Sequence, residues 1–409
     1  MKWICCQLGA REHYAIPRAL FRLNALGQLI TDAWIPATSI LRIVGDQRSG
    51  IGDRWHEELK EACVTPFNWS LIAFEILARA RQLRGWPLII ARNRWFQRKI
   101  VAAFADLRPL TSDSPVLLSY SYTALKPFRY AKRRGWKTVL VQIDPGPEEE
   151  KIVGGEIARV PQLAGEWHPA PAEYWASWRE ECELADRIVA NSEWSREGLV
   201  RGGVPREKIS VIPLAYEAPK VRGQESEFGG ARIYPPRFTE ERPLRVLFLG
   251  LINLRKGVAR LLEAARILRD EPVEFWMVGP AEIANASRGA EAGRVKWFGP
   301  ATRNQAAEFY READIFILPT LSDGFAITQI EAQAHGLPII VSKSCGKVVE
   351  NGVTGITLEE PSAACIAHAL RDCIGNPDRL QKLAEASGLG NDFSLSSVGQ
   401  CLQELAATL

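Results

Sequence analysis

The sequence predicts an α/β protein in which buried strands alternate with helices, arranged in two domains. With 409 residues, the chain is too long for one hydrophobic core and fits two domains of ordinary size. Short apolar runs recur along it and stop at glycine or proline, as strands buried on both faces do. The segment from Ala313 to Ser342 also shows strand, loop, helix and strand in direct succession. These observations favour parallel sheets built from βαβ units.

The composition is that of a soluble globular protein, with 46% hydrophobic and 24% charged residues. The net charge of +3 gives no general reason to expect a nucleic-acid partner. No apolar run reaches the roughly 18 residues that a membrane-spanning helix needs. The eight cysteines show no CxxC spacing, so we expect reduced, structural thiols in a cytoplasmic protein rather than disulfides or zinc sites.

The chain begins with a predicted strand and a polar loop. Met1 to Gly9 is too short for the apolar core of a signal peptide and is typical of a buried first strand. Gly9 would stand at its end, where the first turn of a Rossmann-like domain lies, although no GxGxxG accompanies it. Arg11 and His13 follow, ahead of a helical stretch from Pro17 to Gly27. For His13, a site residue and a helix-start histidine without a role are equally good interpretations.

Between Arg79 and Lys137 the chain is strongly basic, and only Asp106 and Asp113 oppose the positive charge. Aromatic residues such as Trp86 are interleaved with the basic ones. Such a stretch is typical of a peripheral contact with an anionic membrane, and equally of solvated helix faces whose aromatic residues belong to the core. Single-stranded nucleic acid is the weaker alternative, because no recognised binding motif accompanies the charge.

The run Lys137 to Ile143 is β-branched and apolar and predicts a strand. Asp144-Pro145-Gly146-Pro147 ends it in a turn, and the acidic start of a helix, Glu148 to Glu150, follows. Asp144 is the polar candidate for a site residue here. Ordinary turn chemistry explains the same residues equally well, since Asp-Pro and Pro-Gly are common in turns.

The middle of the chain predicts the end of the first domain. Ala185 to Ala190 reads as a strand, with Ser192 as the N-cap of the next helix, and Val211 to Leu214 as one more strand. From Glu217 to Arg242 the sequence becomes polar and rich in glycine and proline, which predicts a linker with a long loop.

The second domain opens with a predicted strand from Leu244 to Gly250, and a helix from Gly257 to Leu268 follows its loop. Arg255 and Lys256 lie just before that helix. At the carboxyl end of a strand, two adjacent cations favour an anion site over solvated charge. Further along, Asn304 to Ala313 predicts a helix with Asn304 as its N-cap.

The segment from Ala313 to Ser342 organises this domain. Ile315 to Leu318 is an apolar run, and a polar loop with Asp323 follows it. Glu331 lies just over a turn into the next helical pattern, which Gly336 stops. A loop that leads into a helix N-terminus offers unpaired N–H groups and the positive end of a dipole, which together bind anions. Carboxylates beside such a site can hold sugar or ribose hydroxyls.

At these residues the chain resembles the family 4 glycosyltransferases. They are retaining enzymes of the GT-B fold, an α/β architecture of two Rossmann-like domains facing across a cleft. The family motif pairs two acids around a Gly-Phe-Gly turn and continues with Glu-Ala and Gly-Leu-Pro. It stands here as Asp323 to Ala326, Glu331-Ala332 and Gly336-Leu337-Pro338. Two residues depart from the pattern, since the first acid is usually Glu and Ala326 stands where glycine is usual. An ordinary βαβ unit with a surface Asp and a solvated Glu is the alternative.

The resemblance implies roles for particular residues. Asp323 would orient the transferred sugar, and Glu331 would bind the ribose hydroxyls. Lys256 would hold the diphosphate, with Arg255 compensating for Leu251, which stands where the family usually has an arginine. The donor side would also include Gly9, Gly324, Phe325 and Ala326, and the acceptor side Arg11, His13 and Asp144.

The resemblance covers nearly the whole chain and implies its division. Residues 1–217 would form the acceptor-side domain, 218–242 the linker, 243–386 the nucleotide-sugar domain, and 387–409 a C-terminal helix that crosses back to the first domain in the family.

The sequence therefore predicts a retaining glycosyltransferase that moves a sugar from a nucleotide diphosphate sugar to a hydroxyl acceptor, which is a glycan, a lipid or a small molecule. A role in polysaccharide biosynthesis would fit this activity. No cofactor and no metal are expected, because the chain contains no Asp-x-Asp. The expected location is the cytoplasm, and peripheral association with the membrane stays open as an alternative. No nucleic-acid partner is expected. Two rivals remain, a nucleotide-sugar epimerase on the same scaffold and a non-catalytic binding protein of GT-B fold.

Overall fold

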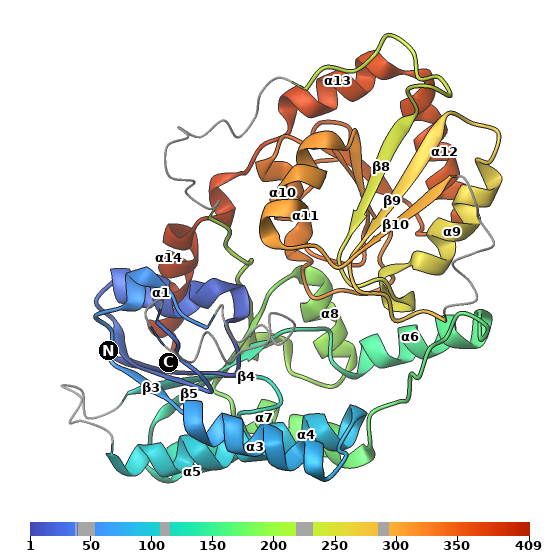
Figure 1. Cartoon of the computed structure of the whole chain (residues 1–409). Coiled ribbons are helices and arrows are strands. Elements are labelled where there is room, and N and C mark those ends of the chain that lie inside the picture. The colour runs from blue at the N-terminus through green and yellow to red at the C-terminus, as the bar shows by residue number, and fades with distance from the viewer. Residues whose placement is uncertain (37–38, 40–53, 107–114, 218–231, 285–293) are drawn as a thin grey trace.

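The computed structural model describes the chain except for residues 37–38, 40–53, 107–114, 218–231 and 285–293. Its described residues form two parallel sheets, each covered by helices on both faces (Figure 1). The predicted pair of Rossmann-like α/β domains is thereby confirmed. Arg108 and Asp113 of the basic stretch, and residues 218–231 of the predicted linker, lie outside the described residues.

The first sheet has seven strands in the order β3-β2-β1-β4-β5-β6-β7, all parallel over the described residues. They are β1 (Trp3–Gln7), β2 (Leu26–Thr31), β3 (Val64–Pro66), β4 (Val116–Tyr120), β5 (Lys137–Gln142), β6 (Arg187–Ala190) and β7 (Ile209–Val211). The order reverses between β1 and β4. In open parallel sheets, ligands bind outside the carboxyl ends of the strands at such a reversal.

Alternation along β1 explains why both faces of this sheet are covered. Ile4 and Cys6 belong to one buried cluster, and Trp3 and Cys5 to the cluster on the opposite face. The first cluster packs below the sheet in Figure 1, against helices of the lower layer. The helices of this domain are α1 (Ala15–Arg22), α3 (Asn68–Ala80), α4 (Gly85–Ala103), α5 (Leu125–Arg133), α6 (Pro147–Arg159), α7 (Ala172–Leu184) and α8 (Glu193–Arg201), with 3-10 turns η1 (Arg11–Tyr14), η4 (Glu57–Leu59), η5 (Phe104–Asp106) and η6 (Arg206–Lys208).

The second sheet has six strands in the order β10-β9-β8-β11-β12-β13, again parallel where described. They are β8 (Leu244–Leu249), β9 (Val273–Val278), β10 (Val295–Gly299), β11 (Ile315–Leu318), β12 (Ile339–Ser342) and β13 (Gly355–Leu358). Helices α9 (Val258–Ile267) and α12 (Ala363–Gly375) cover one face, and α10 (Arg303–Glu312) and α11 (Ile327–Ala334) the other (Figure 1). The remaining helical elements are η7 (Leu254–Lys256), α13 (Pro377–Ala386), η9 (Asn391–Phe393) and α14 (Leu395–Ala406).

The last helix, α14, lies beside α1 of the first domain (Figure 1). Leu395, Val398 and Leu402 are buried in the same cluster as Trp3 and Leu20. The chain thus starts and ends in one hydrophobic core, and α14 ties the second domain to the first.

Three local predictions were wrong. The helix expected from Pro17 to Gly27 ends at Arg22, because Asn24 adopts a left-handed conformation with φ 52°, and Leu26 and Gly27 already belong to β2. Helix α10 begins at Arg303, not after an Asn304 cap, because Thr302 is the N-cap and forms a capping box with Gln305. Strand β7 ends at Val211, before Pro213, which has no N–H to offer a sheet.

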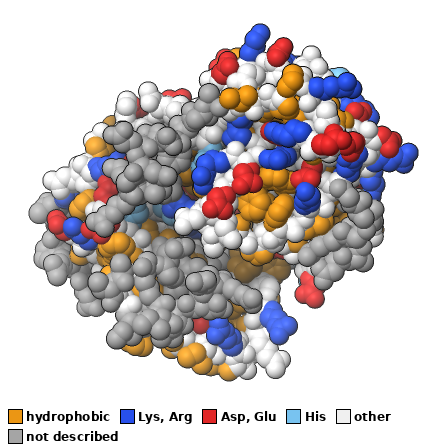
Figure 2. All heavy atoms as spheres, turned by 45° about the horizontal axis from the view of Figure 1, so that its top comes forward, with side chains coloured by type: hydrophobic (Ala, Val, Ile, Leu, Met, Phe, Trp, Pro, Cys, Tyr) orange, Lys and Arg blue, Asp and Glu red, His pale blue; other side chains and the backbone are white. Residues whose placement is uncertain are grey.

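All eight cysteines are free thiols. Among the described helices, none combines the length and apolar character needed to cross a bilayer. On the face shown in Figure 2, basic and acidic side chains lie intermixed over the second domain.

Candidate active site

The pairing of β8 with β11 brings two loops of the second domain together. Ile315 of β11 lies opposite Val246 of β8, and both strands run in the same direction. Their carboxyl ends therefore meet at one edge of the sheet, at the point where the strand order reverses. The loop after β8 carries Arg255 and Lys256, and the loop after β11 carries Asp323.

These three residues form a charged cluster. The ammonium of Lys256 makes an ion pair with Oδ2 of Asp323. Nη1 of Arg255 lies 3.3 Å from the same oxygen and donates a hydrogen bond of 3.1 Å to the carbonyl oxygen of Ser322. Gly257 allows this approach, because it has φ +75° and a Cβ there would overlap the carbonyl oxygen of Pro319. The structure thus brings together three residues that the sequence placed in one site.

Burial tunes the charge of this cluster. Burial and then the neighbouring Arg255 lower the pKa of Lys256 to about 7. The Asp323 carboxylate acts in the opposite direction, since an adjacent negative charge favours the ammonium.

Glu149 of α6 joins the cluster from the first domain. Its Oε2 accepts a hydrogen bond of 3.0 Å from Oγ of Ser322 and lies 3.6 Å from Nη1 of Arg255. Ser322 in turn accepts a hydrogen bond of 3.1 Å from Nε1 of Trp194. Burial raises the pKa of Glu149 to about 7. The two domains therefore meet through a polar network beside Asp323.

Gly324 lies at a close approach of the two domains. A Cβ at this position would overlap the carbonyl oxygen of Ile143 and lie 2.7 Å from Nδ2 of Asn191. The carbonyl oxygen of Gly324 accepts a hydrogen bond from the hydroxyl of Ser192. Any larger residue would push the domains apart, so glycine at 324 is a packing requirement as well as a turn residue.

The next two residues of the motif, Phe325 and Ala326, have structural roles in this loop. The side chain of Phe325 is only 3% exposed and packs against Tyr216 and Ile330, so it is closed to a ligand. Ala326 has φ +66° at the start of α11. This left-handed conformation costs a residue with a Cβ about 1–2 kcal/mol, which gives a physical reason for the glycine that the family usually has here.

Glu331 lies apart from the charged cluster. Its Oε2 accepts a hydrogen bond of 2.9 Å from the hydroxyl of Tyr310 on α10. Burial raises the pKa of Glu331, while the Tyr310 hydrogen bond and the charge of Arg303 lower it. The two acids of the motif thus have different partners, which allows them different tasks.

The predicted site residues after β1 make their contacts within the first domain. The N–H of Gly9 donates a hydrogen bond of 2.9 Å to Oδ1 of Asp32. The guanidinium of Arg11 lies over the ring of Tyr120, 5.7 Å from its centre. Within the described residues, Nε of Arg11 and the hydroxyl of Tyr120 are buried without a hydrogen-bond partner. His13 adopts a left-handed backbone conformation, with φ 49°.

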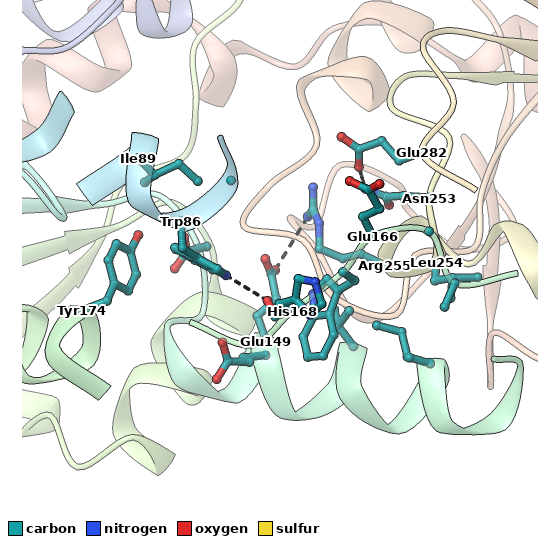
Figure 3. Close-up of a pocket in the computed structure, with 18 of the residues that line it drawn as sticks. Trp86, Ile89, Glu149, Glu166, His168, Tyr174, Asn253, Leu254, Arg255 and Glu282 are labelled. Atoms are coloured by element: carbon teal, nitrogen blue, oxygen red, sulfur yellow. Dashed lines mark hydrogen bonds and ion pairs between the residues drawn. The ribbon is translucent and has the colours of Figure 1, made fainter. Parts of the chain in front are cut away.

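Asp144 lies at the wall of a cavity between the domains. It accepts hydrogen bonds from the hydroxyl of Tyr122 at 2.6 Å and from the N–H of Gly146 at 2.8 Å. The cavity has a volume of about 670 Å³, and Glu149 and Arg255 line it as well. It therefore borders the charged cluster (Figure 3).

Sequence reasoning missed the partners that complete these contacts, above all Glu149, Ser322 and Tyr310. For Glu149 a signal existed, because three acids follow Pro147 directly after a predicted strand. Neither Ser322 nor Tyr310 belongs to a recognisable pattern, and only the folded chain brings them to the acids.

These features define a class of protein. Two parallel α/β domains meet across an interface, with a charged cluster at the strand reversal of the second domain and a cavity beside it. That is the GT-B architecture, and two solved structures share it over their full length. The complex of Anabaena HepE with UDP-glucose aligns with a TM-score of 0.61 at 14% identity, covering 100% of each chain. Sucrose-phosphate synthase from Thermosynechococcus elongatus aligns with 0.64 at 15% identity, covering 100% of this chain and 99% of that one.

Residues 243–376 match the family described as Glycosyl transferases group 1. The D-inositol 3-phosphate glycosyltransferase of Rhodococcus opacus is 29% identical over 255 residues, which is 58% of this chain and 56% of that protein. The chain thus spans about half the length of such relatives. The resemblance to GT-B glycosyltransferases is confirmed.

Proposed function

We propose that the protein transfers a sugar from a nucleotide diphosphate sugar to a hydroxyl acceptor, with retention of configuration. The observation that carries this proposal is the cluster of Arg255, Lys256 and Asp323 at the carboxyl ends of β8 and β11. The match of this domain to a glycosyltransferase family supports it. The structural similarity to HepE, which was solved in complex with UDP-glucose, supports it as well.

The chemistry needs positive charge where the diphosphate leaves. Lys256 and Arg255 provide it in a buried setting, where a fixed charge acts more strongly than in water. Amide groups at the start of α11, after Gly324, would add to it. No metal is needed in this proposal, and full activity in the presence of EDTA is its expected consequence.

The two acids would act on different parts of the donor. When the diphosphate engages Lys256, the Asp323 carboxylate loses part of its ion pair and becomes available to the sugar hydroxyls. Glu331, held by Tyr310, would bind the ribose. Gly9 would border the donor, and Arg11, His13 and Asp144 would face the acceptor.

The decisive experiment is to incubate the protein with UDP-, GDP- and ADP-sugars and a mixture of hydroxyl acceptors. We expect release of one nucleotide diphosphate and a glycoside whose anomeric configuration, read by NMR, matches that of the donor. Inversion would contradict retention. Conversion of the nucleotide sugar to an isomer without release would favour the epimerase, and binding without turnover the non-catalytic protein.

We also propose a peripheral contact of this cytoplasmic protein with anionic membranes, through α3. Trp69, Ile76 and Leu77 form an apolar stripe on this helix and are 75%, 61% and 48% exposed. Arg79 and Arg81 follow at its end and carry the charge that anionic lipid attracts. Some other cations of the basic stretch are already paired with acids, as Arg129 with Glu180 and Lys132 with Asp186.

Vesicle sedimentation tests this contact. The protein should sediment with phosphatidylserine vesicles and be released by salt. Trp69→Ser combined with Arg79→Glu should abolish sedimentation, whereas Lys132→Glu should leave it nearly unchanged. Equal recovery with neutral and anionic vesicles would contradict the proposal.

A further inference from the structure

The cavity between the domains has a composition that the proposed donor site does not explain. Tyr122 and Asp144 reach it from the carboxyl ends of β4 and β5, and the starts of α4 and α7 close it on the side of the first domain. The loops after β8 and β9 contribute Asn253 and Glu282. Its volume of about 670 Å³ lies in the range of small-molecule sites.

One wall of the cavity is aromatic. The rings of Tyr122 and Tyr174 stack with centres 4.7 Å apart, and Trp86 lies 4.8 Å from Tyr174. Trp175 packs edge-on against Tyr174 at 5.2 Å. Nε1 of Trp86 donates a hydrogen bond of 2.9 Å to the carbonyl oxygen of His168, which fixes its ring (Figure 3). Rigid ring faces of this kind suit the apolar face of a sugar ring.

The charged groups of the cavity are mostly acidic. Among the lining residues that the structure describes, five carry carboxyl groups (Asp144, Glu149, Glu150, Glu166 and Glu282), whereas Arg255 is the single Lys or Arg. Nε1 of Trp175 donates 3.1 Å to Glu150, and Asn253 donates 3.0 Å to Glu282. Among the described residues, nothing pairs with the carboxylate of Glu166.

These charges decide which ligands the cavity accepts. Each carboxylate has several lone pairs and can accept hydrogen bonds from hydroxyl or ammonium groups. A phosphate group would meet repulsion from these carboxylates, of which Glu149, with its pKa raised to about 7, is only partly ionised at neutral pH, and attraction from one guanidinium. The diphosphate of the donor therefore belongs on the Lys256 side, outside this cavity.

The cavity nevertheless touches the site of transfer. Glu149 and Arg255 line it and also contact the loop of Ser322 and Asp323. A hydroxyl group of a ligand in the cavity can thus reach the sugar held at Asp323 without crossing another element.

We propose that this cavity binds the acceptor and selects an uncharged or amine-bearing carbohydrate over a phosphorylated one. The assignment of the ligand as acceptor rests on the proposed glycosyl transfer. This preference for unphosphorylated ligands would distinguish the chain from the similar D-inositol 3-phosphate glycosyltransferases, whose name includes a phosphorylated compound.

A direct binding assay tests the cavity independently of turnover. Calorimetric titration with neutral methyl oligosaccharides, amino sugars and sugar phosphates should show binding of members of the first two classes only. Trp86→Ala should weaken that binding at least tenfold, and Trp86→Phe should restore most of it. Binding of sugar phosphates in preference to the other two classes, or equal binding by Trp86→Ala, would overturn the proposal.

Charge reversal gives the sharper test. Glu166→Lys combined with Glu282→Lys should admit sugar phosphates, whereas Glu385→Lys on α13, remote from the cavity, should not. In turnover assays, Trp86→Ala should raise the KM of the acceptor, whereas Glu385→Lys should leave it unchanged. If the wild type neither hydrolyses the donor nor transfers its sugar to an acceptor, glycosyl transfer is contradicted. The titrations would still decide which ligands the cavity binds.

Discussion

The charged cluster and the aromatic cavity share a border but are built in opposite ways. The cluster takes Arg255, Lys256 and Asp323 from two loops of one domain, and strand pairing alone brings these loops together. The cavity assembles residues from Gly85 to Glu282, drawn from both domains. Stabilisation of a leaving diphosphate needs a fixed pair of cations, whereas recognition of an acceptor needs a cavity of matching shape. The first task can be performed by a short motif, and the second only by the folded chain.

The largest expected effect separates the two regions. Lys256→Ala should lower kcat/KM for the donor about a hundredfold, or roughly 2–3 kcal/mol, because the leaving diphosphate loses a buried cation. Steady-state hydrolysis of the donor measures this effect. The exposed Lys60→Ala should match the wild type. An unchanged rate in Lys256→Ala would indicate that Arg255, whose Nη1 lies 3.3 Å from the Asp323 carboxylate, holds the diphosphate instead.

The second prediction divides the two acids of the motif. Asp323→Asn should reduce turnover steeply and leave affinity for the nucleotide diphosphate equal or tighter, because Lys256 is released from its ion pair. Glu331→Gln should instead weaken nucleotide binding about tenfold, since a ribose contact is uniform between ground and transition states. Titration and turnover on the same preparations distinguish them. Full activity in Asp323→Asn would reduce Asp323 to a turn residue.

Glu149 belongs to both regions and should make stability depend on pH. Burial raises its pKa from 4.5 to about 7. Between these values the folded protein holds a proton that the unfolded chain has lost, so this group lowers the unfolding free energy as pH rises, by at most about 1.4 kcal/mol per pH unit. The contribution is complete below pH 4.5 and lost by pH 7.

Denaturation of Glu149→Gln across this range should show a shallower decrease than the wild type. Glu148→Gln, one residue away on α6, is the control and should keep the wild-type slope. Parallel slopes in wild type and Glu149→Gln would mean that the carboxyl group is ionised throughout and that the domain contact does not titrate.

The smallest effect concerns the backbone at the start of α11. Ala326→Gly should raise the unfolding free energy by up to about 1 kcal/mol, because glycine adopts φ +66° without strain. Ala332→Gly, in the buried interior of the same helix, should lower it by about 1 kcal/mol or more. Chemical denaturation measures both. A loss of stability in Ala326→Gly would show that the methyl group packs usefully despite the conformation.

The fold was predictable because the signal is local and repeated. Apolar runs such as Ile315 to Leu318, closed by proline or glycine, each specify a buried strand, and the same signal recurs through both sheets. The start of α10 was predicted wrongly because Asn304 was preferred as a cap, although the pair Thr302 and Gln305 carries the stronger signature.

The site was predictable only in part. Arg255, Lys256 and Asp323 follow strands that turn out to be neighbours, so loop position sufficed to place them together. Trp86 was noticed within the basic stretch, but nothing in its surroundings in the sequence indicates Tyr174, which lies on another helix. Contacts between distant segments depend on how helices pack on a sheet, and single-residue patterns do not encode that.

The most direct test of the central claim is a thermal-shift panel of UDP, GDP and ADP on the wild type and on Lys256→Ala. One nucleotide, at about a hundred times its dissociation constant, should stabilise the wild type by roughly 2.7 kcal/mol. The same concentration should stabilise Lys256→Ala far less. If no nucleotide shifts the wild type, or if the variant responds as strongly, the cluster at Asp323 does not hold a nucleotide diphosphate.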